Sequence, residues 1–538
     1  MRYTACSHYK VLGIIVLVIG VSVGCTPVDH WTIFNQVRPD SSFLNRQEEP
    51  VIMPVDIQKD QAEVSPADTQ AEDLLDLSVE QAVLLALRHN RDLHVRQITP
   101  VIRGAFEQIE RGRYDPEFFA EAEYFKESAS ENAEIGFDTD NDVSKESSIV
   151  TGLRQELPTG TLIEAGIGQS RIISSSNNEE QKARLGLSVT QSLLQGFGPA
   201  VNLASVRQAE FDTLASIYEL RGFTESLLAD TEIAYWRYVL AKEEIAIFLQ
   251  SLAVAKKQRE EIELSIEVGI LPEFEVAAAR AEEAFRIQAL INARSQLEDS
   301  RLRLLRLISP NPDGHLDSEI QTVSEPRIEP QQINDPNDRL QLAEQSRSDL
   351  KEAHLRLQQN RLETIVTRNG ILPRLDLFIS LGKSGYSDTF TDSFREIDGD
   401  SYDLTAGLRL NHFLGNRAAK ARNLAAYATQ QQTREAIANL RLIIHLDVRL
   451  AINEVERLRQ QIDASRATRI FQEQTMNAEK ERFEVGAGTA LQVAQAQRDL
   501  VLTQIAEVEA IVNYRIALVQ LYLAEGSLLE RRGIGLNL

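Results

Sequence analysis

Two patterns of hydrophobic and polar positions alternate along this chain. The first is helical: apolar residues recur every three or four positions through 200–268 and 418–485, which together contain one glycine and no proline. At ~1.5 Å per residue, each stretch spans on the order of 100 Å. Helices of that length do not fit inside one compact globule. The pattern therefore predicts long antiparallel coiled-coil hairpins.

The tip of the predicted hairpin occurs twice. Glu267–Ala279 aligns without gaps with residues 484–496, at an offset of 217 (Val485 minus Val268), and each copy begins Glu-Val-Gly. The segments that follow, 273–308 and 490–524, are again helix-rich. A repeat of this kind indicates an internal duplication. Gly269 and Gly486 offer the positive φ that a helix-ending turn needs.

The second pattern has a period of two. Apolar and polar residues alternate in six stretches, 117–124, 149–157, 161–168, 184–193, 374–381 and 402–411. Strands between lipid and a wet lumen alternate in this way. An amphipathic antiparallel sheet on a soluble core alternates identically. The connections favour the membrane, because a tight turn at 157–161 contrasts with long polar loops at 128–147, 174–180 and 385–399.

The N-terminus predicts export. Arg2 and Lys10 precede a short apolar run at 11–23, which is too short to span a bilayer comfortably. Gly24-Cys25 resembles a bacterial lipoprotein box, although Ser22 stands where leucine is usual, and Thr26 resembles the pattern sent to the outer membrane. Acylation of Cys25 is the favoured outcome. Ordinary cleavage nearby and a retained anchor are the alternatives.

Composition argues against several classes of protein. The chain has 538 residues and a formal charge of -23, which disfavours nucleic acid as a partner. Its two cysteines, Cys6 and Cys25, exclude a disulfide framework or a cysteine metal site in the body. The eight histidines are scattered, and no catalytic, cofactor-binding or metal-binding residue is predicted. Glu/Arg runs on the helices are interpreted as solvated faces and i,i+4 pairs. We therefore do not expect an enzyme.

Several motifs together resemble the TolC-like outer-membrane efflux factors. The run from Leu77 to Leu93 resembles the first-helix signature of that family, with a weaker copy at 343–350. Residues 191–198 and 412–417 resemble its two strand-to-helix exits, and Ala234–Trp236 a later helix motif. The similarity covers roughly 77–525. It implies a mixed α and β membrane protein: a homotrimeric outer-membrane β-barrel continued by a periplasmic α-helical coiled-coil tunnel.

The expected organisation follows from these patterns. It comprises a signal peptide (1–24), a lipid-anchored linker (25–76), a first repeat (77–309) with strands at 115–194 and a hairpin at 199–308, a linker (310–336), a second repeat (337–525) with strands at 373–413 and a hairpin at 417–525, and a C-terminal tail (526–538). The first half offers four strands and the second two, where the family has two per repeat. Three protomers would then close eighteen strands rather than twelve, unless the additional hairpin lies outside the barrel.

The resemblance implies an exit duct for efflux or type I secretion. It implies a periplasmic adaptor, an inner-membrane pump of the resistance-nodulation-division or ABC class, and outer-membrane lipid as partners. The alternative is a non-conducting coiled-coil lipoprotein that tethers the envelope. The candidate site residues are Cys25 for lipid attachment, Val268, Gly269, Val485 and Gly486 for adaptor docking, and Glu275, Gln492 and Gln495 for a periplasmic constriction.

Overall fold

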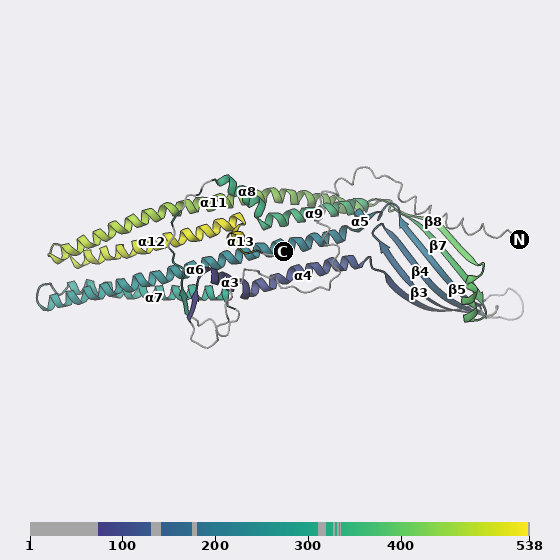
Figure 1. Ribbon diagram of the computed structural model, residues 1–538, viewed down its shortest axis with the longest axis horizontal. Coiled ribbons are helices and arrows are strands. Elements are labelled where there is room, and N and C mark those ends of the chain that lie inside the picture. Colours follow the sequence, from purple (N-terminus) through teal and green to yellow (C-terminus); the bar gives the residue numbers. More distant parts are fainter. Residues whose placement is uncertain are drawn as a thin grey trace. The chain divides into compact units, whose positions relative to one another are not determined.

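The computed structural model describes residues 74–130, 141–174, 180–309, 319–326, 329–330, 333 and 335–535. The predicted signal peptide, the acylation site Cys25 and most of the N-terminal linker lie outside these residues. The described part of the chain combines one large antiparallel sheet with a set of long helices (Figure 1).

Helices occupy the stretches that the helical periodicity predicts. Two helical hairpins, α6–α7 and α11–α12, are drawn in Figure 1. No helix in the described ranges is both long and apolar enough to cross a membrane. The helices are α3 (Val79–His89), α4 (Arg91–Gly112), α5 (Pro199–Asn202), α6 (Ala204–Glu267), α7 (Glu275–Ile308), α8 (Pro336–Ser346), α9 (Ser348–Asn369), α10 (Phe390–Arg395), the 3-10 turn η2 (Glu396–Asp398), α11 (Arg417–Glu484), α12 (Ala490–Glu525) and α13 (Leu528–Arg531).

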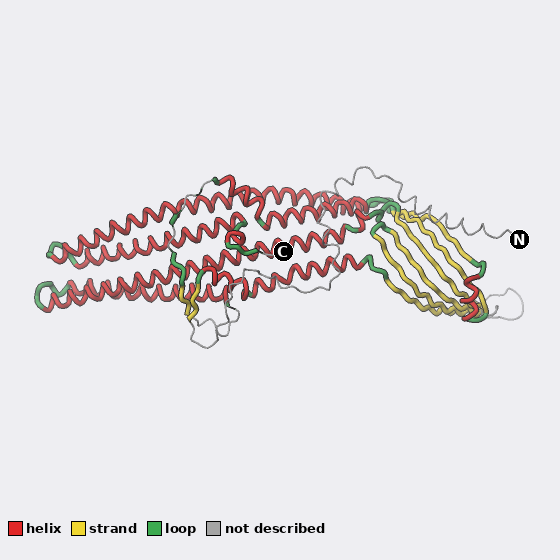
Figure 2. The backbone as a smooth tube through the Cα atoms, in the orientation of Figure 1, coloured by secondary structure: helices red, strands yellow, loops and turns green. Residues whose placement is uncertain are grey.

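The six alternating stretches form one sheet in the order β2-β3-β4-β5-β7-β8, every neighbour antiparallel (Figure 2). Because β2 to β5 are all hydrogen-bonded in sequence, the additional hairpin of the first half belongs to the sheet. The additional hairpin is therefore not separate from the other strands. The strands are β2 (Glu117–Ser130), β3 (Asn141–Leu157), β4 (Thr161–Ser174), β5 (Glu180–Ser192), β7 (Arg374–Ser387) and β8 (Tyr402–Asn411).

The structure also contains a two-stranded sheet, which the sequence does not predict. β1 (Leu74–Leu77) pairs in parallel with β6 (Glu319–Thr322), which lies inside the segment expected to be a linker. Each strand has four residues, too few for a period of two to be recognised. The pair is fixed to α6, since the Tyr235 hydroxyl donates to the Leu77 carbonyl (3.0 Å) and the Tyr238 hydroxyl to the Ile320 carbonyl (2.9 Å).

The first helix of each repeat is broken at an equivalent position. The chain interrupts the helix at Asn90, between α3 and α4, and again at Arg347, between α8 and α9. Subtracting 90 from 347 gives 257, the same offset that relates Asp349 to Asp92. The Asn90 side chain accepts a hydrogen bond from the Leu93 backbone NH and so starts α4. The duplication thus extends to the helix break.

The helices are stabilised by packing on several neighbours. Side chains of β1, β6, α3, α6, α7 and α12 meet around Tyr235, which is fully buried. A second cluster joins α8, α9 and α11, and a third joins α11 to α12. Helix α6 therefore contacts helices of both repeats, which makes it the central element of the helical part.

The segment 526–538, expected to be a tail, instead packs in the core as far as it is described. Helix α13 buries Leu528 and Leu529 against α3, α4, α6 and α12. Arg532 donates two hydrogen bonds to the buried Glu232 carboxylate on α6, at 2.6 and 2.5 Å. The end of the second repeat is thus fixed to the first. The segment is too short for a helical period to predict its burial.

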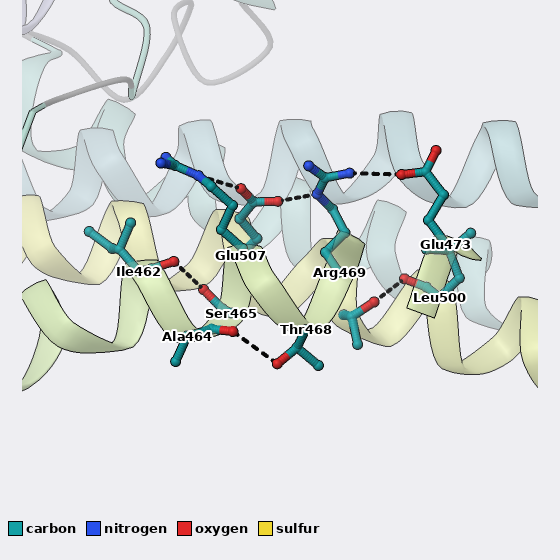
Figure 3. Close-up of polar contacts among 10 residues, drawn as sticks. Ile462, Ala464, Ser465, Thr468, Arg469, Glu473, Leu500 and Glu507 are labelled. Atoms are coloured by element: carbon teal, nitrogen blue, oxygen red, sulfur yellow. Dashed lines mark hydrogen bonds and ion pairs between the residues drawn. The ribbon is translucent and has the colours of Figure 1, made fainter. Parts of the chain in front are cut away.

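The second hairpin is joined by an arginine–glutamate cluster (Figure 3). Glu507 on α12 accepts from Arg469 and from Arg466 (3.3 Å), both on α11, and Arg469 also contacts Glu473 at 3.1 Å. Immediately before the two arginines in the sequence, the Ser465 and Thr468 hydroxyls donate to backbone carbonyls of their own helix. The cluster holds α11 and α12 in one register along their shared face.

A buried glutamate lies where α6, α9 and α13 approach one another. The Glu225 side chain is 4 % exposed, and its carboxylate lies 3.8 Å from Arg221 Nε, beyond hydrogen-bonding distance. Burial raises the pKa of Glu225 to about 7, because the attraction of Arg221 only partly offsets the loss of water and Glu530 adds a like charge.

We predict that Glu225 makes stability fall as pH rises. The unfolded chain loses this proton near 4.5 and the folded chain near 7, so the stabilisation is complete below pH 4.5 and is lost between those values. The change is at most roughly 3 kcal/mol. Thermal unfolding in detergent should therefore depend less on pH in Glu225→Gln than in the native protein. Glu260→Gln, an exposed control on the same helix, should retain the native pH dependence; equal slopes for all three proteins would contradict the assignment.

Candidate functional site

The two hairpin tips end in the same backbone motif. In the first, the Ile270 NH donates to the Ser265 carbonyl (2.8 Å) and the Gly269 NH to the Ile266 carbonyl (3.0 Å). In the second, Ala487 donates to Arg482 (2.8 Å) and Gly486 to Phe483 (2.9 Å). Both are Schellman motifs, with Gly269 at φ +79° and Gly486 at φ +76°. The positive φ expected of these glycines is present.

The tips present apolar side chains to solvent. Val268 is 61 % and Val485 79 % exposed, although both end a helix whose inner face is packed. Ile270 and Phe274 extend the first tip with exposures of 75 % and 73 %. Exposed valine, isoleucine and phenylalanine at the end of a hairpin form a small hydrophobic surface of the kind that binds another protein.

The three candidate constriction residues occupy different positions in the tips. Gln492 completes a capping box: its side-chain oxygen accepts from the Thr489 NH (2.9 Å), while the Thr489 hydroxyl accepts from the Gln492 NH. Gln492 therefore starts α12. Gln495 is exposed one turn later, and Glu275 is half-buried at the first residue of α7.

The two tips contact each other. Ala490, at the start of α12, packs with Ile262 and Ala279 of the first hairpin, and Leu271 and Phe483 adjoin this cluster. A small side chain at Ala490 allows the two hairpins to approach closely. The tips of one chain are therefore a single surface built from both repeats.

A buried ion cluster joins the hairpins near the tips. Glu282 on α7 lies 2.6 Å from Arg286 of the same helix and 2.7 Å from Arg498 on α12. The Glu282 and Arg286 side chains are only 5 % and 3 % exposed, and burial lowers the pKa of Arg286. Removing one partner of such a buried pair typically costs about 3–5 kcal/mol.

Sequence reasoning missed this cluster. Its members lie in the Glu/Arg runs that were interpreted as solvated faces. The only signal was the i,i+4 spacing of Glu282 and Arg286, which exposed pairs share. Arg498 comes from a helix 216 residues away in the sequence, so its approach follows from hairpin packing alone.

The large sheet has one apolar face that the described chain leaves largely uncovered. Large hydrophobic side chains on it are exposed by more than half: Phe118, Leu153, Leu185, Leu404 and Leu408. The cross-strand register places these side chains on the same face of the sheet, as in the directly paired residues Leu153 and Phe118. We call this surface the apolar face. A soluble protein would bury it.

The opposite, polar face carries a row of four glycines. Gly152, Gly166, Gly186 and Gly382 are direct cross-strand partners on β3, β4, β5 and β7. Beside them Arg184 reaches across β7 to Asp403 on β8, with 2.6 Å between Nη2 and Oδ2, and a Cβ on Gly382 would lie 2.5–2.9 Å from this pair. Glycine therefore lets a long charged side chain lie flat on the polar face.

Comparison with known proteins agrees with this architecture. Residues 339–527 match the family model described as outer membrane efflux protein. The resemblance read from the sequence is thereby confirmed. The outer membrane efflux protein BepC of Brucella suis is 23 % identical over 333 residues, covering 61 % of this chain and 68 % of the relative.

The similarity to solved structures extends beyond residues 339–527. A membrane protein from Pseudomonas aeruginosa has a TM-score of 0.62 at 21 % identity, over 83 % of this chain and 93 % of its own. The Campylobacter jejuni CmeC outer membrane channel has a TM-score of 0.62 at 17 % identity, over 84 % and 86 %. The described chain thus shares the fold of these two proteins.

We predict that the tip glycines are required for their backbone conformation. No atom lies within 4 Å of a Cβ built on Gly269 or Gly486, so a larger residue meets strain rather than a clash. Gly269→Val and Gly486→Val should each destabilise the tip by about 1–2 kcal/mol. Hydrogen exchange of the tip amides should accelerate accordingly. Gly486→Asn is the matched control, because asparagine tolerates positive φ; fast exchange in Gly486→Asn as well would contradict this explanation.

Proposed function

We propose that this protein is the outer-membrane exit duct of a tripartite efflux or type I secretion system. Three copies form a barrel in the outer membrane and a helical tunnel in the periplasm. The duct conducts passively what a periplasmic adaptor and an inner-membrane pump deliver. The observation that carries the proposal is the uncovered apolar face of the sheet, in a chain whose residues 339–527 match the outer membrane efflux protein model.

The length of the apolar face suits a membrane. From Tyr402 to Leu410, β8 carries apolar residues at every second position, a span of roughly 27 Å at ~3.4 Å per residue. Outer-membrane barrels have an apolar band of ~25 Å flanked by aromatic residues. Here Phe118 lies at the start of β2 and Tyr402 at the start of β8, which runs in the opposite direction, so these two exposed aromatic residues lie toward opposite ends of the sheet.

The sheet requires more than one copy. Its outer strands β2 and β8 each lack a second partner among the described strands, and open edges do not persist in lipid. With six alternating strands, β8 runs antiparallel to β2, so the β8 of one copy can pair with the β2 of the next. Three copies give eighteen strands, in the range that encloses an aqueous channel.

Two exposed helical stripes support the same contact. Helix α4, which precedes β2, exposes Val95, Ile98, Ile102 and Ile109. Helix α11, which follows β8, exposes Leu424, Leu442, Leu446 and Leu450. Each apolar stripe thus lies on the helix that is next in sequence to an edge strand, α4 beside β2 and α11 beside β8. Packing α4 of one copy on α11 of the next would cover both while the edges pair.

The hairpin tips are the proposed adaptor surface. Val268, Gly269, Val485 and Gly486 would dock the adaptor, and normal efflux in a Gly486→Val strain would count against this role. We keep Glu275 and Gln495 as the residues proposed to line a constriction. Gln492 is a weaker candidate, since its side-chain oxygen already caps α12.

We expect the detergent-extracted protein to have the mass of a trimer and to conduct ions across planar bilayers. Ile102→Glu and Leu446→Glu, each placing a charge in one stripe, should lower the mass by light scattering and abolish conductance. Leu264→Glu, an equally exposed leucine position near a tip, should leave the trimer intact. A trimer without conductance would favour the alternative, a coiled-coil lipoprotein tether.

Acylation of Cys25 is part of the proposal. We expect Cys25→Ser to abolish labelling by a fatty-acid analogue but to leave much of the protein in the outer-membrane fraction, because the barrel holds it there. The matched control Cys6→Ser removes a cysteine of the signal peptide and should leave labelling unchanged. Loss of all membrane association in Cys25→Ser would instead support a tether.

A further inference from the structure

The connection between β7 and β8, which the sequence predicts to be a long polar loop, contains a short helix. Helix α10 (Phe390–Arg395) and η2 (Glu396–Asp398) follow β7 at the end of that strand opposite to α9. The Thr389 hydroxyl caps α10 by accepting from the Asp392 NH. The helix contacts β5 and β7, whereas the edge strands β2 and β8 form no comparable contact with it among the described residues.

Two small residues show on which side of the sheet α10 lies. A Cβ on Gly385 of β7 would meet backbone atoms of Ser393, Glu396 and Ile397 at 2.1–2.7 Å. Gly385 has the parity of Leu377, Ile379 and Leu381, so its missing side chain points to the apolar face. Its cross-strand partner Ala183 is fully buried there, although the same face of β5 is exposed at Leu185 and Leu187. Helix α10 therefore lies flat on the apolar face.

The side chains of α10 differ in exposure according to whether they face the sheet or point away from it. Ser393 is fully buried toward the sheet. Phe390 and Phe394, one turn apart, contact each other with ring centroids 5.0 Å apart, and Phe390 is 56 % exposed. Arg395 and Asp392, which pair at 3.4 Å, remain on the outside with 77 % and 51 % of their side chains exposed.

We infer that α10 is an interfacial element that binds the headgroup–acyl boundary of the outer leaflet, with Phe390 and Phe394 inserted and Asp392 and Arg395 among the headgroups. The inference rests on the proposed function, in which the apolar face meets lipid. The occupant follows from continuity: the helix prolongs the apolar face at the level of Tyr402, whose partner Lys383 is two residues from Gly385. Aromatic rings with a polar rim are typical of this boundary.

A neighbouring copy is a poorer occupant for the same surface. Ring closure brings β2 and β8 together, whereas α10 covers β5 and β7 within the sheet. A charged rim around two phenylalanines also suits a surface that is apolar on one side and wet on the other. The lipid boundary meets both conditions.

The test uses tryptophan depth in lipid. The full chain with Trp31→Phe is reconstituted in phosphatidylcholine vesicles brominated either near the headgroup or near the acyl-chain end, and the signal of the buried Trp236 is subtracted. Phe390→Trp should lose more fluorescence to shallow than to deep bromines. Leu408→Trp, in the middle of the apolar face, should lose more to deep bromines, and Thr405→Trp on the polar face should lose little to either.

The outcomes separate the inference from the function on which it rests. Quenching at residue 408 with none at 390 leaves the membrane barrel standing and overturns the role of α10. Quenching at 390 by deep bromines alone overturns the headgroup-level placement. No quenching at 408 refutes the lipid-facing sheet and, with it, the inference.

Discussion

The rest of this structure depends on a sheet that its own chain cannot complete. Six antiparallel strands present one face of large apolar side chains and two edges without partners among the described strands. Neither feature persists in water: an open edge pairs with other chains, and an exposed apolar face drives aggregation. Lipid on one side and further copies at both edges resolve the two problems together. Trimer and membrane are thus linked requirements in the proposed duct.

The long helices meet a related constraint in water. A helix such as α6, with 64 residues, does not have a single apolar stripe, because its neighbours change along its length. Near β1 it buries Tyr235 and Trp236 against both repeats, and near the tip it buries Ile262 against Ala279 and Ala490. Charged pairs such as Glu282 with Arg498 then fix which helices meet. Stability here comes from tertiary packing more than from the helix itself.

Periodicity predicted the parts of the fold that repeat over many residues. The strands, both hairpins and the glycine turns at Gly269 and Gly486 followed from spacing alone, because each is a local property of the backbone. The parts that were missed are short or depend on distant partners. β1 needs β6, some 245 positions later, and α13 is buried only because Leu528 meets residues of the first repeat. Likewise Glu282 could be distinguished from a solvated glutamate only by the packing of α12.

The duplication is unequal, and the inequality has a physical consequence. The tips, helix breaks and hairpins are repeated, but the first half contributes four strands and the second two. Because a hairpin adds two strands, the number of strands per copy stays even. The β8 of one copy can therefore still pair antiparallel with the β2 of the next. The additional hairpin widens the proposed ring. A wider ring needs side chains that leave the lumen open, and Gly382 contributes by letting Arg184 reach across β7 to Asp403 rather than project from the polar face. In the duct proposed above, the additional hairpin and Gly382 thus both widen the lumen.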